Sequence, residues 1–180
     1  MLETYEETLK FIHSLPKFKR TNDLDNIKEA LNRLGNPQDS YETIHITGTN
    51  GKGTTTNFLA NLLEASGKRV GMFTSPFIKE FNERIQINHQ YISNDELVKE
   101  VNYIKKKVSG IPLAEFEFVT ILGYFYFRGR VDVAVIEAGI GARHDKTNVI
   151  TPVLSIITSI DLDHEKLIGP TLQDIAKEKA

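Results

Sequence analysis

The sequence predicts an α/β fold with a mostly parallel, P-loop-type sheet that carries helices on both faces. Apolar segments of strand length alternate with longer segments of helical periodicity, which is typical of a parallel sheet covered by helices. The segment 153–157 has no polar face, as expected for a covered strand. A glycine-rich segment, 48–53, joins a predicted strand directly to a predicted helix.

The first part of the chain contains two predicted helices, over residues 2–14 and 24–34. In the second helix, leucine and isoleucine recur at intervals of three and four, and a glycine follows. The basic and polar segment 16–23 between the helices is expected to be a loop. Alternating isoleucines predict a strand at about 43–47, and the helix after the glycine-rich segment is expected to end near Gly67.

The middle of the chain predicts a short strand over 70–73 and a hairpin around 85–92. A Ser-x-x-Glu capping box opens a predicted helix over 93–108. Residues 116–127 are apolar or aromatic on most sides, which predicts a buried helix.

Two strands and a helix are predicted in the last part of the chain. The strands cover 131–136 and 153–157, and helical spacing begins at Thr171 and continues to the end. Because the chain stops inside this helix without a Gly, Asn or Pro signal, we expect it to be a truncated part of a longer protein.

The composition is that of a globular protein, with 40% apolar residues, 26% charged residues and a net charge of −2. This balance gives no support for broad binding to nucleic acids or to a membrane surface. The absence of cysteine excludes disulfides and thiolate metal sites. Since the sequence contains neither a signal peptide nor an apolar run of about 20 residues, we expect a cytoplasmic protein.

The glycine-rich segment has the features of a phosphate-binding loop. Small residues let backbone N–H groups surround phosphate oxygens, and the dipole of the following helix adds positive potential. Lys52 would neutralise the β- and γ-phosphates of a nucleotide, and the Thr54 hydroxyl would bind Mg²⁺. The candidate nucleotide-binding residues are Gly48, Thr49, Asn50, Gly51, Lys52, Gly53 and Thr54.

The loop departs from the strict pattern Gly-x4-Gly-Lys-Ser/Thr at two positions. Ile46 stands where the first glycine belongs, and Gly53 stands where the hydroxyl belongs. A glycine-rich turn with an incidental lysine is the structural alternative. Three glycines and a lysine at the opening of a helix exceed what a turn needs, so we favour the nucleotide-binding hypothesis.

Several motifs resemble those of the Mur ligase superfamily, whose members join a carboxylate to an amine and release ADP and phosphate. Residues 47–54, Thr-Gly-Thr-Asn-Gly-Lys-Gly-Thr, resemble its phosphate loop. Other motifs resemble its folate branch, the folylpolyglutamate and dihydrofolate synthases. They are residues 74–76 with 81–85, 137–141 with 147–149, 158–164 and 176–180. The matches are collinear and span residues 16–180.

The resemblance implies ATP-dependent addition of L-glutamate to folate or dihydropteroate through an acyl phosphate, with ATP and Mg²⁺ as cofactors. Members of this family continue beyond this point. Residues 1–180 are therefore expected to form a truncated N-terminal ATP-binding domain of the Mur ligase central type, without the C-terminal glutamate-ligase domain. On that basis we expect the isolated chain to be inactive and the full-length protein to be a monomer.

Glu137 follows an apolar strand, which places its carboxylate at the sheet edge where parallel sheets bind ligands. Its hard oxygens suit Mg²⁺. The resemblance implies that Glu137, Ser75 and His164 hold one magnesium ion, and that Thr54 holds the ion nearer the β- and γ-phosphates. Taken alone, Ser75 would be a turn serine, and His164 would be a loop or core histidine because imidazole is less typical of magnesium sites.

Lys179 corresponds to a lysine that the family carries as a carbamate, an anion that can orient Mg²⁺. As the penultimate residue it lies on a helix end that is expected to fray, so we expect this site not to form in the isolated chain. Together with Lys52, Glu137 and His164 it completes the candidate catalytic set. The remaining histidines lack ligand spacing and are expected to be structural or solvated; they are His13, His45, His89 and His144.

The resemblance also implies a pterin site, in which an aromatic ring could stack on the flat heterocycle. Its candidate residues are Phe116, Glu117, His144, Asp145 and Lys146, and residues 20–25 are expected to add a loop. A packed aromatic helix is the structural alternative for Phe118, Phe125 and Phe127. The sequence departs from the family near this site at Phe77, Ala142, His144 and Lys146.

Two other functions remain open. One is a Mur-type peptidoglycan ligase with a UDP-linked substrate, which the segment 81–85 argues against. The other is a non-catalytic nucleotide-binding fragment or pseudoenzyme, which truncation favours. A GTPase switch is not supported, since the sequence lacks a guanine-reading Asn-Lys-x-Asp motif, and nothing indicates nucleic-acid recognition.

Overall fold

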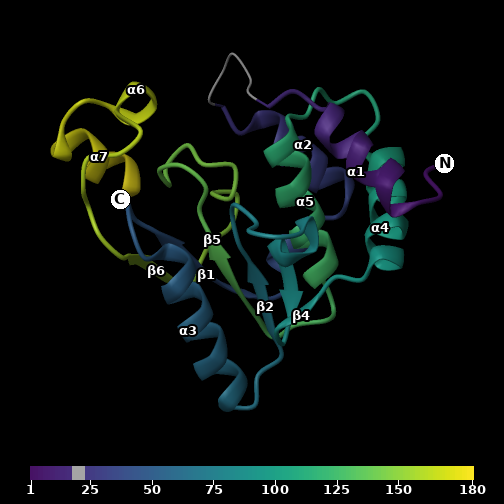
Figure 1. Cartoon of the computed structure of the whole chain (residues 1–180), viewed down its shortest axis with the longest axis horizontal. Helices are drawn as coiled ribbons and strands as arrows, with labels where there is room; N and C mark the ends of the chain where they lie inside the picture. The colour runs from purple at the N-terminus through teal and green to yellow at the C-terminus, as the bar shows by residue number, and fades with distance from the viewer. Residues whose placement is uncertain (18–22) are drawn as a thin grey trace.

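The computed structural model describes residues 1–17 and 23–180, which fold around one six-stranded sheet (Figure 1). The strands are β1 (Glu42–Thr47), β2 (Val70–Phe73), β3 (Ile85–Ile87), β4 (Gln90–Tyr91), β5 (Val133–Glu137) and β6 (Leu154–Ile157). Their order across the sheet is β4-β3-β2-β5-β1-β6. Strands β2, β5, β1 and β6 are parallel, whereas β3 and β4 form an antiparallel hairpin at one edge. The predicted mostly parallel sheet and the predicted hairpin are both confirmed.

The helices cover both faces of the sheet, as predicted. They are α1 (Tyr5–Ser14), α2 (Asp25–Arg33), α3 (Lys52–Ala65), α4 (Asn94–Lys107), α5 (Glu115–Phe127), α6 (Glu165–Ile168) and α7 (Leu172–Lys179), with short 3₁₀ turns η1 (Pro37–Asp39) and η2 (Phe81–Arg84). Helix α3 packs on one face, and α1, α2, α4 and α5 form the layer on the other (Figure 1). None of the helices in the described part of the chain is both long enough and apolar enough to span a membrane.

The alternation of residues along β1 separates these two layers. Ile44 and Ile46 pack toward α3, in a cluster with alternate residues of β2 and β5. His45 and Thr47 face the opposite side, where both side chains hydrogen-bond to the loop that follows β5. Because β1 is a central strand, its carboxyl end is surrounded by loops from its neighbours, and this is where the candidate site lies.

Helix α5 is buried along most of its length, as its aromatic sequence predicts. It approaches the sheet closely at two glycines. A methyl group at Gly123 would lie 2.7 Å from the ring of Phe73, and one at Gly71 would lie 2.9 Å from the ring of Phe127. The glycines therefore allow large rings on the opposing element to fill the interface at close packing density.

Two predicted boundaries shift by a few residues. Helix α1 begins later than expected because Thr4 is its N-cap, in a capping box with Glu7. Strand β5 begins later because Asp132 bonds to Arg69, which lies between α3 and β2, with its Oδ1 2.8 Å from Arg69 Nη2. Both shifts come from local side-chain bonds that end regular structure.

The strand predicted at 153–157 forms, but the expected covering of both sheet faces does not extend to it. This strand is β6, at the edge of the described sheet, where its only partner is β1. Val153, Leu154 and Ile157 are 63%, 47% and 44% exposed. A mostly apolar sequence shows that a strand is suited to burial, but it does not fix the position of that strand in the sheet.

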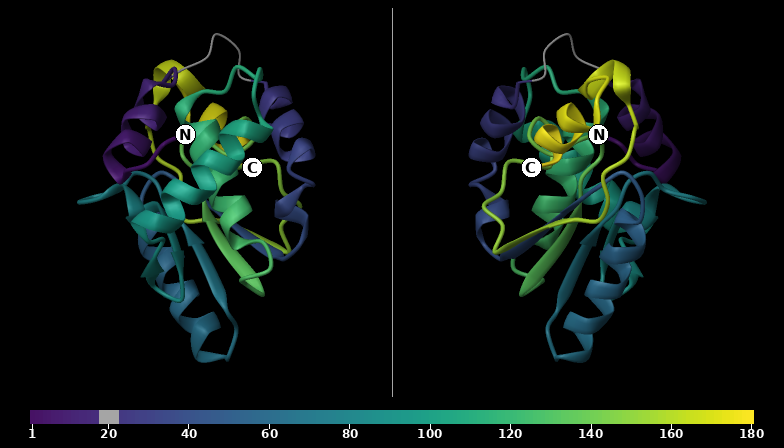
Figure 2. Two further views of the ribbon diagram at one scale, coloured as in Figure 1. Left: turned by 90° about the vertical axis from the view of Figure 1, so that its right-hand side faces the viewer. Right: turned by 90° about the vertical axis from the view of Figure 1, so that its left-hand side faces the viewer.

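The C-terminal helices lie at the end of the sheet where α3 begins. In Figures 1 and 2, α6 and α7, drawn in yellow, lie toward the N-terminal end of α3 and far from its C-terminal end. Residues 18–22, which belong to the predicted loop between α1 and α2, lie outside the described part of the chain.

Candidate functional site

The loop between β1 and α3 turns sharply because two glycines adopt positive φ. Gly51, with φ of 80°, is the N-cap of α3, and Gly48 has φ of 145°. A side chain at Gly48 would collide with Thr158 Oγ1. The loop backbone therefore approaches the neighbouring segment more closely than any residue other than glycine allows.

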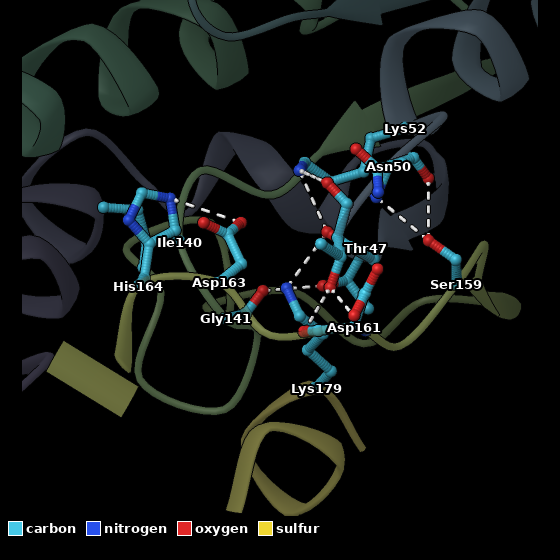
Figure 3. A network of polar contacts seen from close by, with 12 residues as sticks. Thr47, Asn50, Lys52, Ile140, Gly141, Ser159, Asp161, Asp163, His164 and Lys179 are labelled. Carbon is cyan, nitrogen blue, oxygen red and sulfur yellow. Dashed lines mark hydrogen bonds and ion pairs between the residues drawn. The ribbon is translucent and has the colours of Figure 1, made fainter. Parts of the chain in front are cut away.

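The segment that follows β6 holds this loop in place (Figure 3). Ser159 accepts hydrogen bonds from the backbone N–H groups of Thr49 and Asn50, both at 2.9 Å. Thr158 Oγ1 donates to the Asn50 carbonyl at 2.6 Å, and Thr49 Oγ1 donates to the Asp161 carbonyl at 3.1 Å. This role of the segment could not be predicted from the sequence, because the pairing of β6 with β1 that brings it here has no local signal.

Two lysines meet at one carbonyl of the loop (Figure 3). Lys52 Nζ donates to the Gly48 carbonyl at 2.9 Å, and Lys179 Nζ donates to the same oxygen at 3.0 Å. Lys179 is only 4% exposed, and burial followed by the charge of Lys52 lowers the pKa of its ammonium group. The expectation that this helix end frays is wrong, because α7 packs its last turn against the loop.

Glu137 ends β5 with its side chain turned toward the start of α3. Its Oε2 accepts the backbone N–H of Ser75 at 3.1 Å, and a methyl group at Gly53 would lie 3.7 Å from the same oxygen. Burial raises the pKa of the Glu137 carboxyl, and the Ser75 N–H and the charge of Lys52 partly offset this effect. Two residues predicted to share a site, Glu137 and Ser75, are therefore in contact.

His164 and Thr54 are more open. The His164 ring is 43% exposed, with Nε2 3.6 Å from Asp163 Oδ2 (Figure 3). His164 lines the same cavity as Ser75. Thr54 lies exposed in the first turn of α3, and no side-chain hydrogen bond joins it to Ser75, Glu137 or His164 within the described residues.

The donors present fit a magnesium ion that is shared with a bound phosphate. Within residues 1–17 and 23–180, no group of three or more carboxylates and histidines forms a ready-made metal cage. Mg²⁺ does not require one, since it usually keeps several waters and takes one or two carboxylates together with phosphate oxygens. The buried carboxylate of Glu137 beside Ser75 supplies such a ligand set.

A cavity of about 410 Å³ adjoins these residues. Its walls include Ser75 and His164 together with four of the five candidate pterin residues, namely Phe116, His144, Asp145 and Lys146. The fifth, Glu117, is fully buried, and its Oε2 accepts the Ala114 N–H at the start of α5. The structure thus gathers the candidate pterin residues at one cavity, with the exception of Glu117. The Glu117 carboxylate is buried behind the lining residue Lys146, whose Nζ is 4.0 Å from Glu117 Oε1.

Several lining residues already have bonds within the protein. Asp145 Oδ2 accepts the N–H groups of Gly139 and Ile140 at 3.1 and 2.9 Å, so this buried carboxylate shapes the loop after β5. His144 Nδ1 is 2.9 Å from Glu178 Oε2, which ties the same loop to α7. Residues 20–22 of the loop expected to add pterin contacts lie outside the described residues.

Other candidate aromatics and histidines have structural surroundings. Phe118 is buried against Phe11, with ring centroids 5.4 Å apart, and Phe125 stacks on Tyr103 outside the cavity. His45 is buried with Nε2 2.8 Å from Thr147 Oγ1, and burial lowers the pKa of its ring. The structural alternative therefore applies to Phe118 and Phe125, and His45 is a core residue as expected.

The site identifies the class of protein: a P-loop-type α/β domain whose glycine-rich loop and lysine lie at the carboxyl edge of a parallel sheet, beside a buried carboxylate. No family model matches the chain. The chain is 51% identical to the folylpolyglutamate synthase of Lacticaseibacillus casei over 98% of its own length and 43% of that protein. It is 39% identical to the dihydrofolate synthase/folylpolyglutamate synthase of Bacillus subtilis, over 100% of its length and 44% of that protein.

A solved complex of FPGS with AMPPCP and folate has the same fold. It superposes with a TM-score of 0.93 at 50% identity, over 98% of this chain and 45% of that one. The chain is therefore homologous to the folylpolyglutamate synthases and dihydrofolate synthases, as the sequence motifs indicated, and it spans less than half the length of the relatives it matches.

Proposed function

We propose that this chain supplies the ATP-binding part of a ligase that joins L-glutamate to the carboxylate of folate or dihydropteroate. The observation that carries this proposal is 51% identity to a folylpolyglutamate synthase across nearly the whole chain, phosphate loop included. The relative in B. subtilis bears both synthase names, and the superposed structure contains an ATP analogue and folate. Because the chain matches under half of each relative, the activity is proposed for the whole protein.

Within this proposal, Lys52 and the loop N–H groups bind the β- and γ-phosphates of ATP. Thr54 would hold Mg²⁺ near these phosphates, and Glu137, Ser75 and His164 would hold a second ion, which offsets charge on the transferring phosphoryl group. Burial of Glu137 supports this assignment, since a desolvated carboxylate that accepts a single N–H bond gains strongly from a cation.

The reaction we propose has two steps. A carboxylate oxygen of the pterin substrate attacks the γ-phosphorus of ATP, which breaks the bond to the β-phosphate oxygen and gives ADP and an acyl phosphate. The amine of glutamate then attacks the acyl carbon, forms the amide, loses a proton and releases phosphate. Positioning and charge neutralisation supply most of the catalysis, so no covalent enzyme nucleophile is needed.

We assign Lys179 a catalytic role as a carbamate, following the resemblance to the family. Carbamylation requires a neutral amine, and burial already lowers the pKa of Lys179. We place residues 1–180 in an N-terminal ATP-binding domain of the Mur ligase central type and glutamate binding in a separate domain. We also propose that the full-length enzyme is monomeric and cytoplasmic.

The turnover test uses the whole protein that contains this sequence, and its Lys52→Ala variant. Assayed with ATP, L-glutamate and either reduced folate or dihydropteroate, the parent should form the amide and release ADP. Lys52→Ala should lower kcat/KM by at least about 1,000-fold, because it removes the cation that meets the β- and γ-phosphates.

Lys68→Ala provides the control, since Lys68 is an exposed lysine beyond the end of α3. Activity of Lys52→Ala close to that of this control would contradict the assignment of the phosphate loop. Amide formation with a UDP-linked muramoyl substrate and not with a pterin would instead favour the peptidoglycan ligase.

A further inference from the structure

A second cavity adjoins the one that holds the candidate pterin residues. It has a volume of about 250 Å³ and is lined by Lys17, Arg84, Glu115, Phe116 and Val119. Lys17 and Phe116 also line the larger cavity, so the two spaces share a wall. No residue from this smaller cavity except Phe116 belongs to the sites considered above.

Arg84 is the unusual residue of this cavity. It ends η2 with its guanidinium 5.3 Å from the centroid of the Phe77 ring and 5.8 Å from that of Phe81. Within the described residues its Nε is buried without a hydrogen-bond partner, and no carboxylate forms an ion pair with it. Burial lowers the pKa of Arg84, whereas the charge of Glu115 raises it. An incompletely paired, desolvated guanidinium is costly, which favours an external anionic partner.

The position of Arg84 connects it to the proposed reaction centre. Its Nη1 lies 3.5 Å from Ser75 Oγ, and the backbone of Ser75 binds Glu137. Among the described residues that line the cavity, the one carboxylate is already engaged, because Glu115 Oε1 is 2.9 Å from His13 Nδ1. Lys17, exposed at the shared wall, adds a second positive charge. Arg84 and Lys17 thus present positive charge to a ligand that enters from the larger space.

The chemistry of the proposed substrates supplies a suitable anion. A pteroylglutamate has an α- and a γ-carboxylate, and only one of them can accept the phosphoryl group in a given turnover. The other carboxylate must be desolvated beside the same site, and burying it there without a partner would cost free energy. Dihydropteroate has a single carboxylate and presents no such group. The planar fork of arginine matches a carboxylate in two parallel hydrogen bonds.

Resting on the function proposed above, we propose that Arg84, assisted by Lys17, forms a subsite for the α-carboxylate of a pteroylglutamate. The subsite favours substrates that already carry a glutamate over those that do not. Arg84 touches the substrate but not the reacting atoms. The competing interpretation is that Arg84 only supports Ser75 and the ring of Phe77, in which case its loss would affect all pterin ligands equally.

The test compares two ligands that differ only at this carboxylate: folate and its α-amide. Each is titrated into the 180-residue chain and into Arg84→Gln, Arg84→Lys and the surface control Arg33→Gln, with thermal melts to verify folding. We expect the parent to bind folate at least about 10-fold more tightly than the amide, the effect of one charge-assisted pair. In Arg84→Gln this preference should disappear through weaker folate binding, and Arg84→Lys should keep part of it.

The contradicting outcomes are equally specific. Equal affinity of the parent for the two ligands, equal losses for both in Arg84→Gln, or no binding of either ligand would each overturn the subsite. If Arg84→Gln fails to fold, Lys17→Gln replaces it. Lys17→Gln should then weaken the affinity for folate, by less than Arg84→Gln would, and leave the affinity for the α-amide unchanged. Titration of Mg·ATP into the same chain separates failure of the subsite from failure of the proposed function. If nucleotide binding depends on Lys52 but the preference for folate over its amide is absent, only the subsite is contradicted.

Discussion

Gly48 carries the tightest steric requirement in the candidate site. It has φ of 145°, and a methyl group there would meet Thr158 Oγ1. We predict that Gly48→Ala lowers the free energy of unfolding by about 3 kcal/mol, combining backbone strain with overpacking. Urea denaturation measures this loss, and nucleotide affinity should fall with it because the loop must shift.

Gly67→Ala is the matched control. Gly67 also has positive φ, at 88°, but nothing lies within 4 Å of a methyl group placed there. Its cost should be backbone strain alone, about 1 kcal/mol. Equal losses for the two variants would contradict the close approach of the 158–161 segment to the loop.

Single residues were predictable where their chemistry depends on local spacing. Lys52 and the glycines around it follow from the loop pattern, and the place of Glu137 follows from the strand end that it occupies. The resemblance alone placed Ser75 with Glu137, which its backbone N–H contacts, since Ser75 taken alone would be a turn serine. The helix end that carries Lys179 was predicted to fray. This prediction failed because sequence position alone does not reveal that the Lys179 side chain reaches the Gly48 carbonyl, 131 residues away in the chain. Arg84 had no signal beyond its motif, since its position over the rings of Phe77 and Phe81 depends on how residues 77–84 fold back on themselves.

At the scale of elements, Glu96 links α4 to the end of α5. Its carboxylate accepts from Ser93 in the capping box, from the Tyr126 hydroxyl at 3.1 Å and from Arg130 at 2.6 Å. Burial acts to raise the pKa of Glu96, but the bonds from Arg130, Ser93 and Tyr126 outweigh it and lower the pKa to about 2.

This lowered pKa predicts a pH-dependent contribution to stability. The contribution is fully present above the unfolded value of 4.5 and is lost as the pH falls toward 2, since the folded state holds the proton less tightly. Glu96→Gln should reduce the free energy of unfolding at pH 7 by about 1 kcal/mol, discounted for partial exposure. The difference from the parent should shrink between pH 4.5 and 2 in urea titrations.

Glu29→Gln offers the comparison, because Glu29 forms an exposed pair with Arg33 one turn along α2. Such pairs contribute about 0.3–0.5 kcal/mol. A Glu96→Gln loss no larger than this, or one that persists unchanged to pH 2, would contradict the network between α4 and α5.

Helices were predicted better than strand positions, and the reason is physical. The capping box at Ser93 and the aromatic content of 116–127 are local signals, and both helices formed as expected. Strand β6 has the same apolar character as the central strands, yet it lies at an edge with Leu154 exposed. Position within a sheet depends on pairing across the chain, which no local pattern encodes.

At the scale of the whole molecule, the sheet order explains how the site is assembled. With β1 between β5 and β6, the phosphate loop lies between the strand end that carries Glu137 and the segment that carries Ser159. Helix α7 then returns to the same edge and places Lys179 against the loop (Figure 3). Residues from the second quarter to the end of the chain therefore converge on one point, and the fold positions a loop that could not hold its shape alone.

The central claim is that this loop binds ATP, and calorimetric titration of Mg·ATP into the 180-residue chain tests it most directly. Lys52→Ala and Lys68→Ala are titrated under identical conditions. We predict saturable binding with one nucleotide per chain, weakened at least about 10-fold in Lys52→Ala and unchanged in Lys68→Ala. Absence of binding by a chain shown to be folded, or equal binding by all three proteins, would contradict the assignment.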